Sequence, residues 1–138
     1  MHTQLQDDAM RTPNVQSEYA SGVLTLTVSG DIDHHCAASL RTSVDREIYY
    51  YRPKLVLLHL GDVTFMDSAG LGFFMGRYQL CKTLGCAFRL VDPPERVMRI
   101  LSLSGMDRKL TVEKVYRGEK RSTGPSAAEG IKIEEERI

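Results

Sequence analysis

The sequence predicts one α/β domain with a mixed, mainly parallel β-sheet, an N-terminal hairpin arm and helices packed against the sheet. Segments with strand character alternate with segments of helical periodicity, and the connections between them are short. Residues 55–60 (LVLLHL) form a nearly continuous apolar run, which is typical of a parallel strand buried on both faces. Residues 23–28 (VLTLTV) alternate apolar side chains with threonine, which is the pattern of a half-buried strand.

The first elements are expected to be a hairpin and a crossover helix. Residues 1–13 are polar and are interpreted as a flexible lead-in, and residues 15–19 and 23–28 form two arms joined by a turn at residues 20–22. Residues 30–33 end the second arm. The helix that follows ends before Pro53, because proline disfavours a helical residue in front of it. Its apolar stripe comprises Ala37, Leu40, Val44, Ile48 and Tyr51.

The later elements repeat the order of strand and helix. A strand at residues 54–60 precedes a helix from Ser68 to Leu84, which Gly85 closes as a left-handed cap. The apolar stripe of this helix comprises Leu71, Phe74, Met75, Tyr78 and Cys81. Another strand covers residues 86–91. Pro94 then suits the first turn of a helix whose inward side chains are Val97, Ile100 and Leu101 and which ends at Ser104 and Gly105, before a short strand at 110–112.

The predicted domain covers residues 14–116, and residues 117–138 are interpreted as a tail or linker. The tail mixes charged residues with glycine and proline, a composition that does not favour a packed core. Within it, residues 131–133 (IKI) have the character of a strand, but the sequence does not identify a pairing partner.

Composition argues against several classes of protein. The chain has 18 basic and 18 acidic residues, so no overall field attracts nucleic acid or an anionic membrane. The N-terminus lacks the regions of a signal peptide, and no apolar run approaches the length of a membrane span. Cys36, Cys81 and Cys86 are irregularly spaced, which suggests reduced, buried thiols. The sequence therefore predicts a cytoplasmic protein that contacts neither nucleic acid nor membrane.

Residues 65–72 (FMDSAGLG), between a strand and a helix, carry the main functional signal. They place Ser68 near a helix N-terminus at the carboxyl end of a parallel strand, where open α/β sheets position functional groups. A hydrolase nucleophile elbow, G-x-S-x-G, would need glycine in place of Met66 and a histidine after the serine, whereas all four histidines precede it. Both features disfavour hydrolysis.

Nucleotide binding is also disfavoured by spacing. A dinucleotide fingerprint that begins at Gly70 and Gly72 would need its third glycine at Met75, and Gly76 comes one residue late. The sequence contains no G-K-[ST] of a P-loop. Close packing of the helix against the sheet is the simpler explanation of Gly70, Gly72 and Gly76.

A second polar cluster, formed by Asp31, Asp33, His34 and His35, follows the hairpin arm and is expected near Ser68 at the same edge of the sheet. A metal site is disfavoured, because the side chains of His34 and His35 are expected to point apart and no ligand quartet has a known spacing. The alternative is that Asp33 or His34 caps the first helix.

Ser68 has a structural and a functional interpretation. It would be an N-cap if its hydroxyl bonded the first amides of the helix, but Asp67 is equally suited to that task. Phosphorylation of Ser68 would add about −1.5 to −2 charges at a helix N-terminus, where the dipole and free amides tolerate an anion. Beside Asp67, this charge would repel an acidic or apolar partner while the domain stays folded.

These segments resemble the STAS domains, and among them the bacterial anti-sigma factor antagonists of the sporulation type. Residues 65–72 resemble the family's phosphorylation-site signature, residues 30–35 (GDIDHH) resemble the segment before its first helix, and residues 102–106 (SLSGM) resemble its closing helix. Ala69 stands where many relatives carry a second serine, and the tail after Tyr116 extends beyond the usual domain end.

The resemblance implies a non-enzymatic switch without a metal or cofactor of its own. In the family, the antagonist binds an anti-sigma factor that is also a serine kinase, and this releases a sigma factor that activates transcription. The kinase inactivates the antagonist by phosphorylation, and a metal-dependent serine phosphatase restores it. The resemblance makes Ser68 the phosphoacceptor. The partner-binding residues that it implies are Asp31, Asp33, His34, Met66, Asp67, Ala69, Gly70, Leu71 and Gly72.

Two other functions remain open from the sequence. A constitutive STAS scaffold of stressosome or transporter-associated type would bind partners without cycling a phosphate. A small nucleotide-binding or hydrolytic protein is the other class. The sequence also does not separate a sporulation pathway from a stress pathway.

Overall fold

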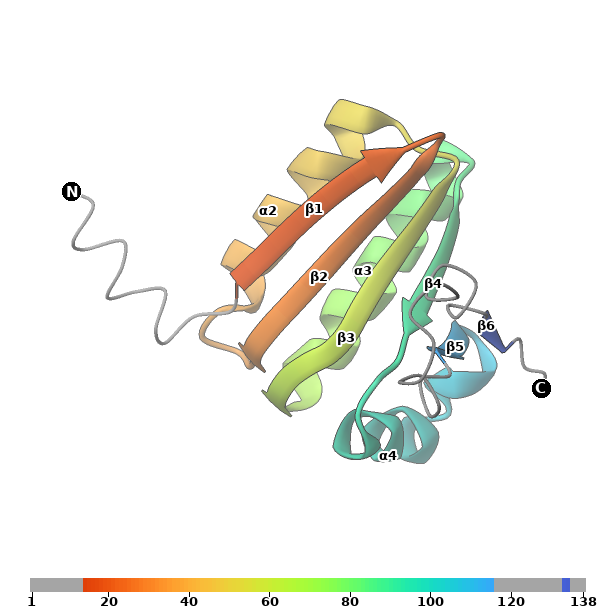
Figure 1. Ribbon diagram of the computed structural model, residues 1–138. Helices are drawn as coiled ribbons and strands as arrows, with labels where there is room; N and C mark the ends of the chain where they lie inside the picture. The colour runs from red at the N-terminus through yellow and green to blue at the C-terminus, as the bar shows by residue number, and fades with distance from the viewer. Residues whose placement is uncertain (1–13, 116–132, 135–138) are drawn as a thin grey trace, which may run out of the picture.

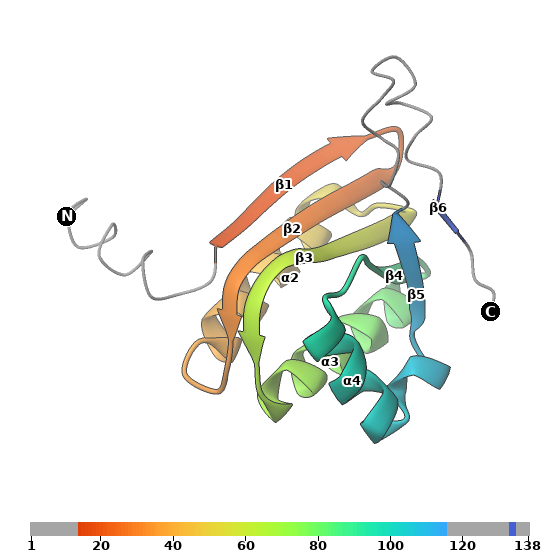
Figure 2. The ribbon, with the colours of Figure 1, turned by 60° about the horizontal axis from the view of Figure 1, so that its bottom comes forward.

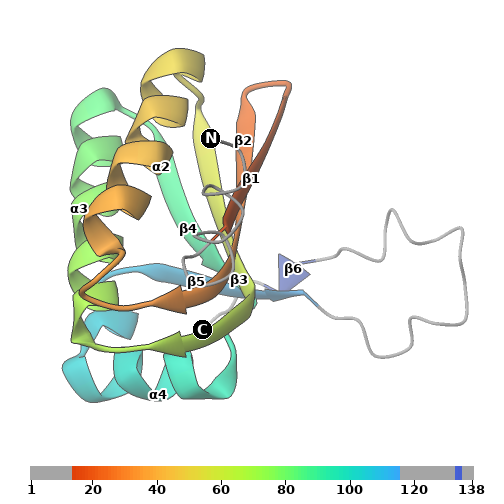
Figure 3. The ribbon, with the colours of Figure 1, turned by 90° about the vertical axis from the view of Figure 1, so that its left-hand side faces the viewer.

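One β-sheet, with helices α2 and α3 on one of its faces, organises the protein (Figure 1; Figure 3). The computed structural model describes residues 14–115 and 133–134. The strands are β1 (Asn14–Ala20), β2 (Val23–Ile32), β3 (Leu55–Met66), β4 (Ala87–Val91), β5 (Thr111–Val115) and β6 (Ile133–Glu134). The helices are α2 (Ala37–Tyr51), α3 (Ser68–Leu84) and α4 (Glu95–Ser104), and a 3-10 turn, η1, covers Met106–Arg108.

The sheet has the strand order β1-β2-β3-β4-β5-β6. The hairpin partners β1 and β2 are antiparallel, β2 through β5 are parallel to one another, and β6 is antiparallel to β5. The predicted fold class, with its hairpin arm and mainly parallel sheet, is therefore confirmed.

The core lies between the sheet and helices α2 and α3. Its largest contributors alternate along β2 and β3 and meet apolar side chains from both helices: Leu24, Leu26, Val28, Val56, Leu58, Leu60, Leu40, Val44, Ile48, Phe73 and Phe74. The alternate residues Leu55, Leu57 and His59 are only half-buried. The prediction that β3 is buried on both faces is therefore wrong. Both long helices, α2 and α3, cover the same face of the sheet and leave the other face partly exposed (Figure 3).

Strands β2 and β3 extend further than the sequence pattern predicts. Their parallel pairing continues to Asp31 opposite Phe65 and Ile32 opposite Met66, with register irregularities after Thr27 and Gly30. The predicted end of β3 at residue 60 is wrong, because the strand continues to Met66. Beyond residue 60, two exposed residues precede each buried one, so the sequence no longer alternates with the period of two that identifies a strand. The extension brings both strands to the edge of the sheet where α3 begins.

The predicted helix ends are confirmed with one shift. Gly85 and Gly105 close α3 and α4 in the left-handed region, at φ of 76° and 81°. Pro94 is the N-cap of α4 and so precedes the first turn instead of lying within it. Val97 and Leu101 are buried, as predicted, and Ile100 packs against the core while only partly buried.

The glycines of α3 differ from the prediction. A Cβ atom at Gly70 would collide with the side chain of Met66, so close packing is confirmed there. Among the described residues outside the local helix backbone, none has an atom within 4 Å of the position that a Cβ would occupy at Gly72 or Gly76, so the prediction of close packing is wrong for both.

The lead-in at residues 1–13 and most of the tail lie outside the described residues. The exception is β6, whose residues Ile133 and Glu134 pair with Val115 and Lys114. Of the segment at residues 131–133, the structure describes Ile133, and this residue pairs with β5. In the described ranges, none of the helices has the length and apolar character needed to cross a membrane.

We predict opposite effects for two glycine-to-alanine substitutions in α3. Gly76→Ala adds a methyl group in open space and raises helix propensity, so the free energy of unfolding should rise by about 0.5–1 kcal/mol. Gly70→Ala forces Met66 to move and should lower the free energy of unfolding by about 1–3 kcal/mol. Urea denaturation of both variants measures this, and equal destabilisation of both would contradict it.

Candidate functional site

Ser68 is the first residue of α3 and lies at the edge where β2 and β3 end side by side (Figure 2). Its side chain is exposed, and the structure shows no hydrogen bond from its hydroxyl to a described residue. The strand-to-helix turn therefore presents a serine whose hydroxyl is not used to hold the fold together.

Asp67 performs the capping that the sequence assigned to either Asp67 or Ser68. Its Oδ1 accepts a hydrogen bond from the Ala69 N–H at 2.8 Å. Its Oδ2 accepts one from the His34 N–H at 3.3 Å and lies 3.3 Å from His34 Nδ1. One carboxylate thus joins the start of α3 to the loop between β2 and α2, and the prediction that the polar cluster lies near Ser68 is confirmed.

Asp33 orders that loop from the other side. Its Oδ1 accepts hydrogen bonds from the N–H groups of His35 at 3.0 Å and Cys36 at 3.2 Å, and from the Cys36 Sγ at 3.0 Å. The prediction that Asp33 or His34 caps α2 is wrong, because the N-cap residue is Cys36, which has no side-chain cap hydrogen bond, and the Asp33 carboxylate bonds amides of the turn just before the helix. The prediction that the two histidines point apart is wrong, since the rings of His34 and His35 lie with centroids 4.1 Å apart.

Asp31 completes the acidic side of the site. It lies opposite Phe65 in the sheet, and its Oδ1 accepts a hydrogen bond of 2.7 Å from the Thr64 hydroxyl. Asp31, Asp33 and Asp67 therefore all belong to the segments that end or begin at the Ser68 edge.

Two of these carboxylates are held in the ionised form. The hydrogen bond from the Cys36 thiol lowers the pKa of Asp33 against the opposing effect of burial, and the neighbouring amides lower it further. Burial acts to raise the pKa of Asp67, but the hydrogen bonds from Ala69 and His34 outweigh it, so this pKa also lies below its ordinary value. The site is therefore anionic at neutral pH.

Ser68, His34 and Asp67 do not form a catalytic triad in this structure. His34 contacts Asp67, but no hydrogen bond joins the His34 ring to the Ser68 hydroxyl. A nucleophilic serine needs such a base within hydrogen-bond distance. The Ser68 hydroxyl is thus exposed, with no hydrogen bond to a base among the described residues.

Three of the predicted partner-binding residues, Met66, Gly70 and Leu71, are buried or half-buried beneath the turn at residues 65–72. The Met66 side chain is only 2 % exposed, Gly70 is buried above it, and Leu71 is half-buried. Met66 and Gly70 are therefore too deeply buried to form part of the surface. Gly72 is exposed and Ala69 partly so, and for these two and the polar residues, contact with a partner stays a prediction.

The structure adds residues that the sequence reasoning missed. Phe65 is 44 % exposed, and Arg96 of α4 donates a hydrogen bond of 2.9 Å from Nη1 to the Thr64 carbonyl oxygen. The motif at residues 65–72 contained the signal for Phe65, but nothing in the sequence places α4 beside the end of β3.

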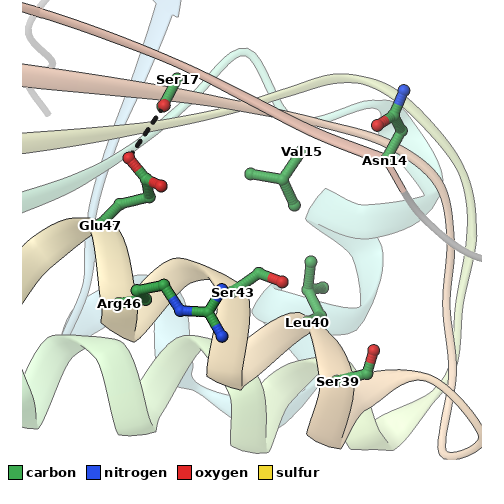
Figure 4. Close-up of a pocket in the computed structure, with 8 residues that line it drawn as sticks. All are labelled: Asn14, Val15, Ser17, Ser39, Leu40, Ser43, Arg46 and Glu47. Atoms are coloured by element: carbon green, nitrogen blue, oxygen red, sulfur yellow. Dashed lines mark hydrogen bonds between the residues drawn. The ribbon is translucent and has the colours of Figure 1, made fainter.

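A cavity between β1 and α2 lies away from the predicted site residues. It has a volume of about 320 Å³ and includes none of those residues (Figure 4). It is lined by Asn14, Val15, Ser17, Ser39, Leu40, Ser43, Arg46 and Glu47. No group of three or more His, Cys, Asp or Glu side chains within residues 14–115 and 133–134 has the arrangement to hold a metal ion.

The chain is similar to one family of known proteins. The STAS domain model matches residues 14–120. The chain is 35% identical to the anti-sigma F factor antagonist of Paenibacillus polymyxa over 92 residues, which are 67% of this chain and 79% of the relative. It is 28% identical to the anti-sigma-B factor antagonist of Bacillus subtilis over 67% of this chain and 84% of that relative.

Solved structures show the same fold. The unphosphorylated anti-sigma factor antagonist SpoIIAA is similar with a TM-score of 0.64 at 20% identity, over 86% of this chain and 98% of the other. The phosphorylated form of SpoIIAA from Bacillus has a TM-score of 0.59 at 20% identity, over 77% of this chain and 95% of the other. The family model and these relatives show that the chain belongs to the STAS domain family, and the relatives named here are anti-sigma factor antagonists.

Proposed function

We propose that this protein is an anti-sigma factor antagonist that uses the Ser68 edge to bind an anti-sigma factor with serine kinase activity. Binding releases a sigma factor in the cytoplasm, phosphorylation of Ser68 stops binding, and a serine phosphatase restores it. The observation that carries this proposal is an exposed serine at the N-terminus of α3 whose capping task is performed by Asp67.

The geometry favours a change of surface charge over a change of fold. A phosphoryl group on Ser68 would stand at a helix N-terminus, which stabilises an anion through its dipole and free amides. The same group would join Asp31, Asp33 and Asp67, of which two have lowered pKa values. The edge would become strongly anionic while the backbone beneath it stays in place.

The names of the relatives support this proposal. The Paenibacillus relative is named for antagonism of an anti-sigma F factor and the Bacillus subtilis relative for antagonism of an anti-sigma-B factor. The Bacillus SpoIIAA structure with a similar fold is described in a phosphorylated form. Both names support the role of an anti-sigma factor antagonist for this chain.

The first test is phosphorylation by the kinase-type anti-sigma factor encoded in the same genome. Incubation with this kinase and ATP should add one phosphate to Ser68, as located by mass spectrometry of peptides. Ser68→Ala should accept none, whereas Ser43→Ala, which removes an exposed serine of α2, should be phosphorylated normally. A protein that binds the kinase and stays unphosphorylated would instead fit a constitutive STAS scaffold.

The second test separates binding from folding. Ser68→Asp should weaken binding of the anti-sigma factor by about tenfold or more. The new carboxylate adds to the negative charge of Asp67 and so makes the surface that faces the partner more anionic. Its free energy of unfolding should stay equal or rise by about 0.3–1 kcal/mol, because the new carboxylate lies in the first turn of α3. Titration calorimetry and thermal denaturation give the two values, with Ser43→Asp as the control. A large fall in Tm for Ser68→Asp would show that Ser68 has a structural role.

The third test uses pH to measure the Asp67 cap. Because the folded-state pKa of Asp67 is lowered, its stabilisation is present above the unfolded value of about 3.9 and is lost as pH falls through the folded value. Asp67→Ala should therefore lower the free energy of unfolding by about 1 kcal/mol at pH 7 and by progressively less as pH falls through the folded-state pKa. Denaturation curves across this range measure the difference, and Asp62→Ala, at an exposed position of β3, is the control. A deficit that does not change with pH would contradict the assignment.

A further inference from the structure

We propose that the partner interface extends from Ser68 onto a second patch, which we call the β3–α4 surface and define as Phe65, Arg96, Arg99 and Leu103. The surface fits a partner region that presents an apolar contact beside carboxylate groups. This inference rests on the proposed function, because the partner is the same anti-sigma factor.

Exposed apolar side chains single out this surface. The described residues include five large hydrophobic side chains that are exposed, and three of them are tyrosines, which keep a hydroxyl in water. The other two are Phe65, 44 % exposed, and Leu103, 81 % exposed. Neither has a polar group to offset its exposure, so contact with a partner would remove apolar area from water.

Helix α4 places two arginines next to these apolar groups. Arg96, Arg99 and Leu103 recur at a spacing of three and four residues and so share one face of α4, while Val97 and Leu101 are buried on another. The hydrogen bond from Arg96 Nη1 to the Thr64 carbonyl oxygen joins this face to β3 one residue before Phe65. Segments about 30 residues apart in the sequence thus lie next to each other, and Figure 2 shows α4 and the end of β3 at the same end of the sheet.

A cavity of about 390 Å³ between β3 and α4 gives the surface a place for a partner side chain. It is lined by Val63, Thr64, Pro94, Glu95, Arg96 and Arg99. Two arginines and one glutamate leave this lining with a net positive charge.

Arg99 is available for a stronger ion pair than the one it makes. Its Nη2 lies 3.6 Å from Glu95 Oε2, and both side chains are largely exposed, at 65 % and 86 %. Such a pair contributes little. A partner carboxylate would meet a guanidinium that can donate two parallel hydrogen bonds, which gives both strength and direction.

The charges on the two sides of Phe65 have opposite sign. Asp31, which lies opposite Phe65 in the sheet, belongs with Asp67 to the acidic side, and Arg96 and Arg99 form the basic side. Opposite charges on either side of an apolar contact fix the orientation of a partner. Phosphorylation of Ser68 would add negative charge on the acidic side of Phe65.

The test measures binding of the anti-sigma factor from the same genome to the full-length, unphosphorylated protein by titration calorimetry. Phe65→Ala and Arg99→Glu should each weaken binding by about tenfold or more, as for anchor residues of other interfaces. The effect of Arg99→Glu should shrink at high salt, because the side chain is exposed. The matched controls are Tyr50→Ala and Arg41→Glu, which change an exposed aromatic and an exposed arginine of α2 and should leave binding unchanged.

The outcomes separate this inference from the proposed function. Wild-type binding together with normal binding of Phe65→Ala and Arg99→Glu would overturn the β3–α4 surface and leave the Ser68 proposal in place. Equal losses in the controls would also overturn it, because the effect would not be specific to this surface. Failure of the wild type to bind would remove both proposals. Circular dichroism of each variant establishes that the fold is intact, and a variant that unfolds is replaced by Phe65→Leu or Arg99→Gln.

Discussion

The carboxylate of Asp67 is the contact on which the candidate site depends. One oxygen holds the Ala69 amide at the start of α3, and the other holds the His34 amide in the loop before α2. Because this single group satisfies donors from two segments, the adjacent Ser68 has no hydrogen bond to make within the described fold. A serine without a structural task can change its charge at little cost to stability, which is what a covalent switch needs.

The scaffold beneath the site is fixed by contacts that lie away from it. Arg77 of α3 is 5 % exposed, and its Nε lies 2.7 Å from Asp45 Oδ1 of α2. The same guanidinium donates to the Phe73 carbonyl oxygen, which satisfies part of its hydrogen-bonding capacity. A buried charge keeps its partner because separation would leave it unpaired in the interior. The pair therefore holds α2 and α3 in one relative position on the sheet.

The sequence predicted most of the element order and the position of Ser68, because both depend on local patterns. Alternation in β2, the apolar stripes of α2 and α3, and the glycine caps are each contained in one short segment. The end of β3 was missed because Asp62 and Thr64 are exposed polar residues within a strand that continues to pair with β2. The buried Arg77 interrupts an apolar helix, and only tertiary contact with Asp45 accounts for it.

The β3–α4 surface was missed for a related reason. Arg96 and Thr64 meet across 32 positions of the chain, and no pattern within either segment specifies that contact. The sequence identified the two acidic segments, residues 30–35 and 65–72, because each follows a predicted strand, and the carboxyl ends of parallel strands meet at one edge of a sheet. The exposure of Phe65 depends on whether another part of the chain packs over it, and this can be read only from the three-dimensional structure.

The parallel pairing of β2 with β3 also has a consequence for when the site exists. Val23 pairs with Leu55 and Ile32 with Met66, so every contact in this ladder closes a loop of more than 30 residues that contains α2. Pairings of such long sequence separation slow folding, since the chain entropy is lost before the contacts are gained, and they exist only once the tertiary fold has formed. A newly made or unfolded chain contains the residues 65–72 but not the edge that presents them. A partner that binds this edge would therefore bind the folded chain and not the unfolded one.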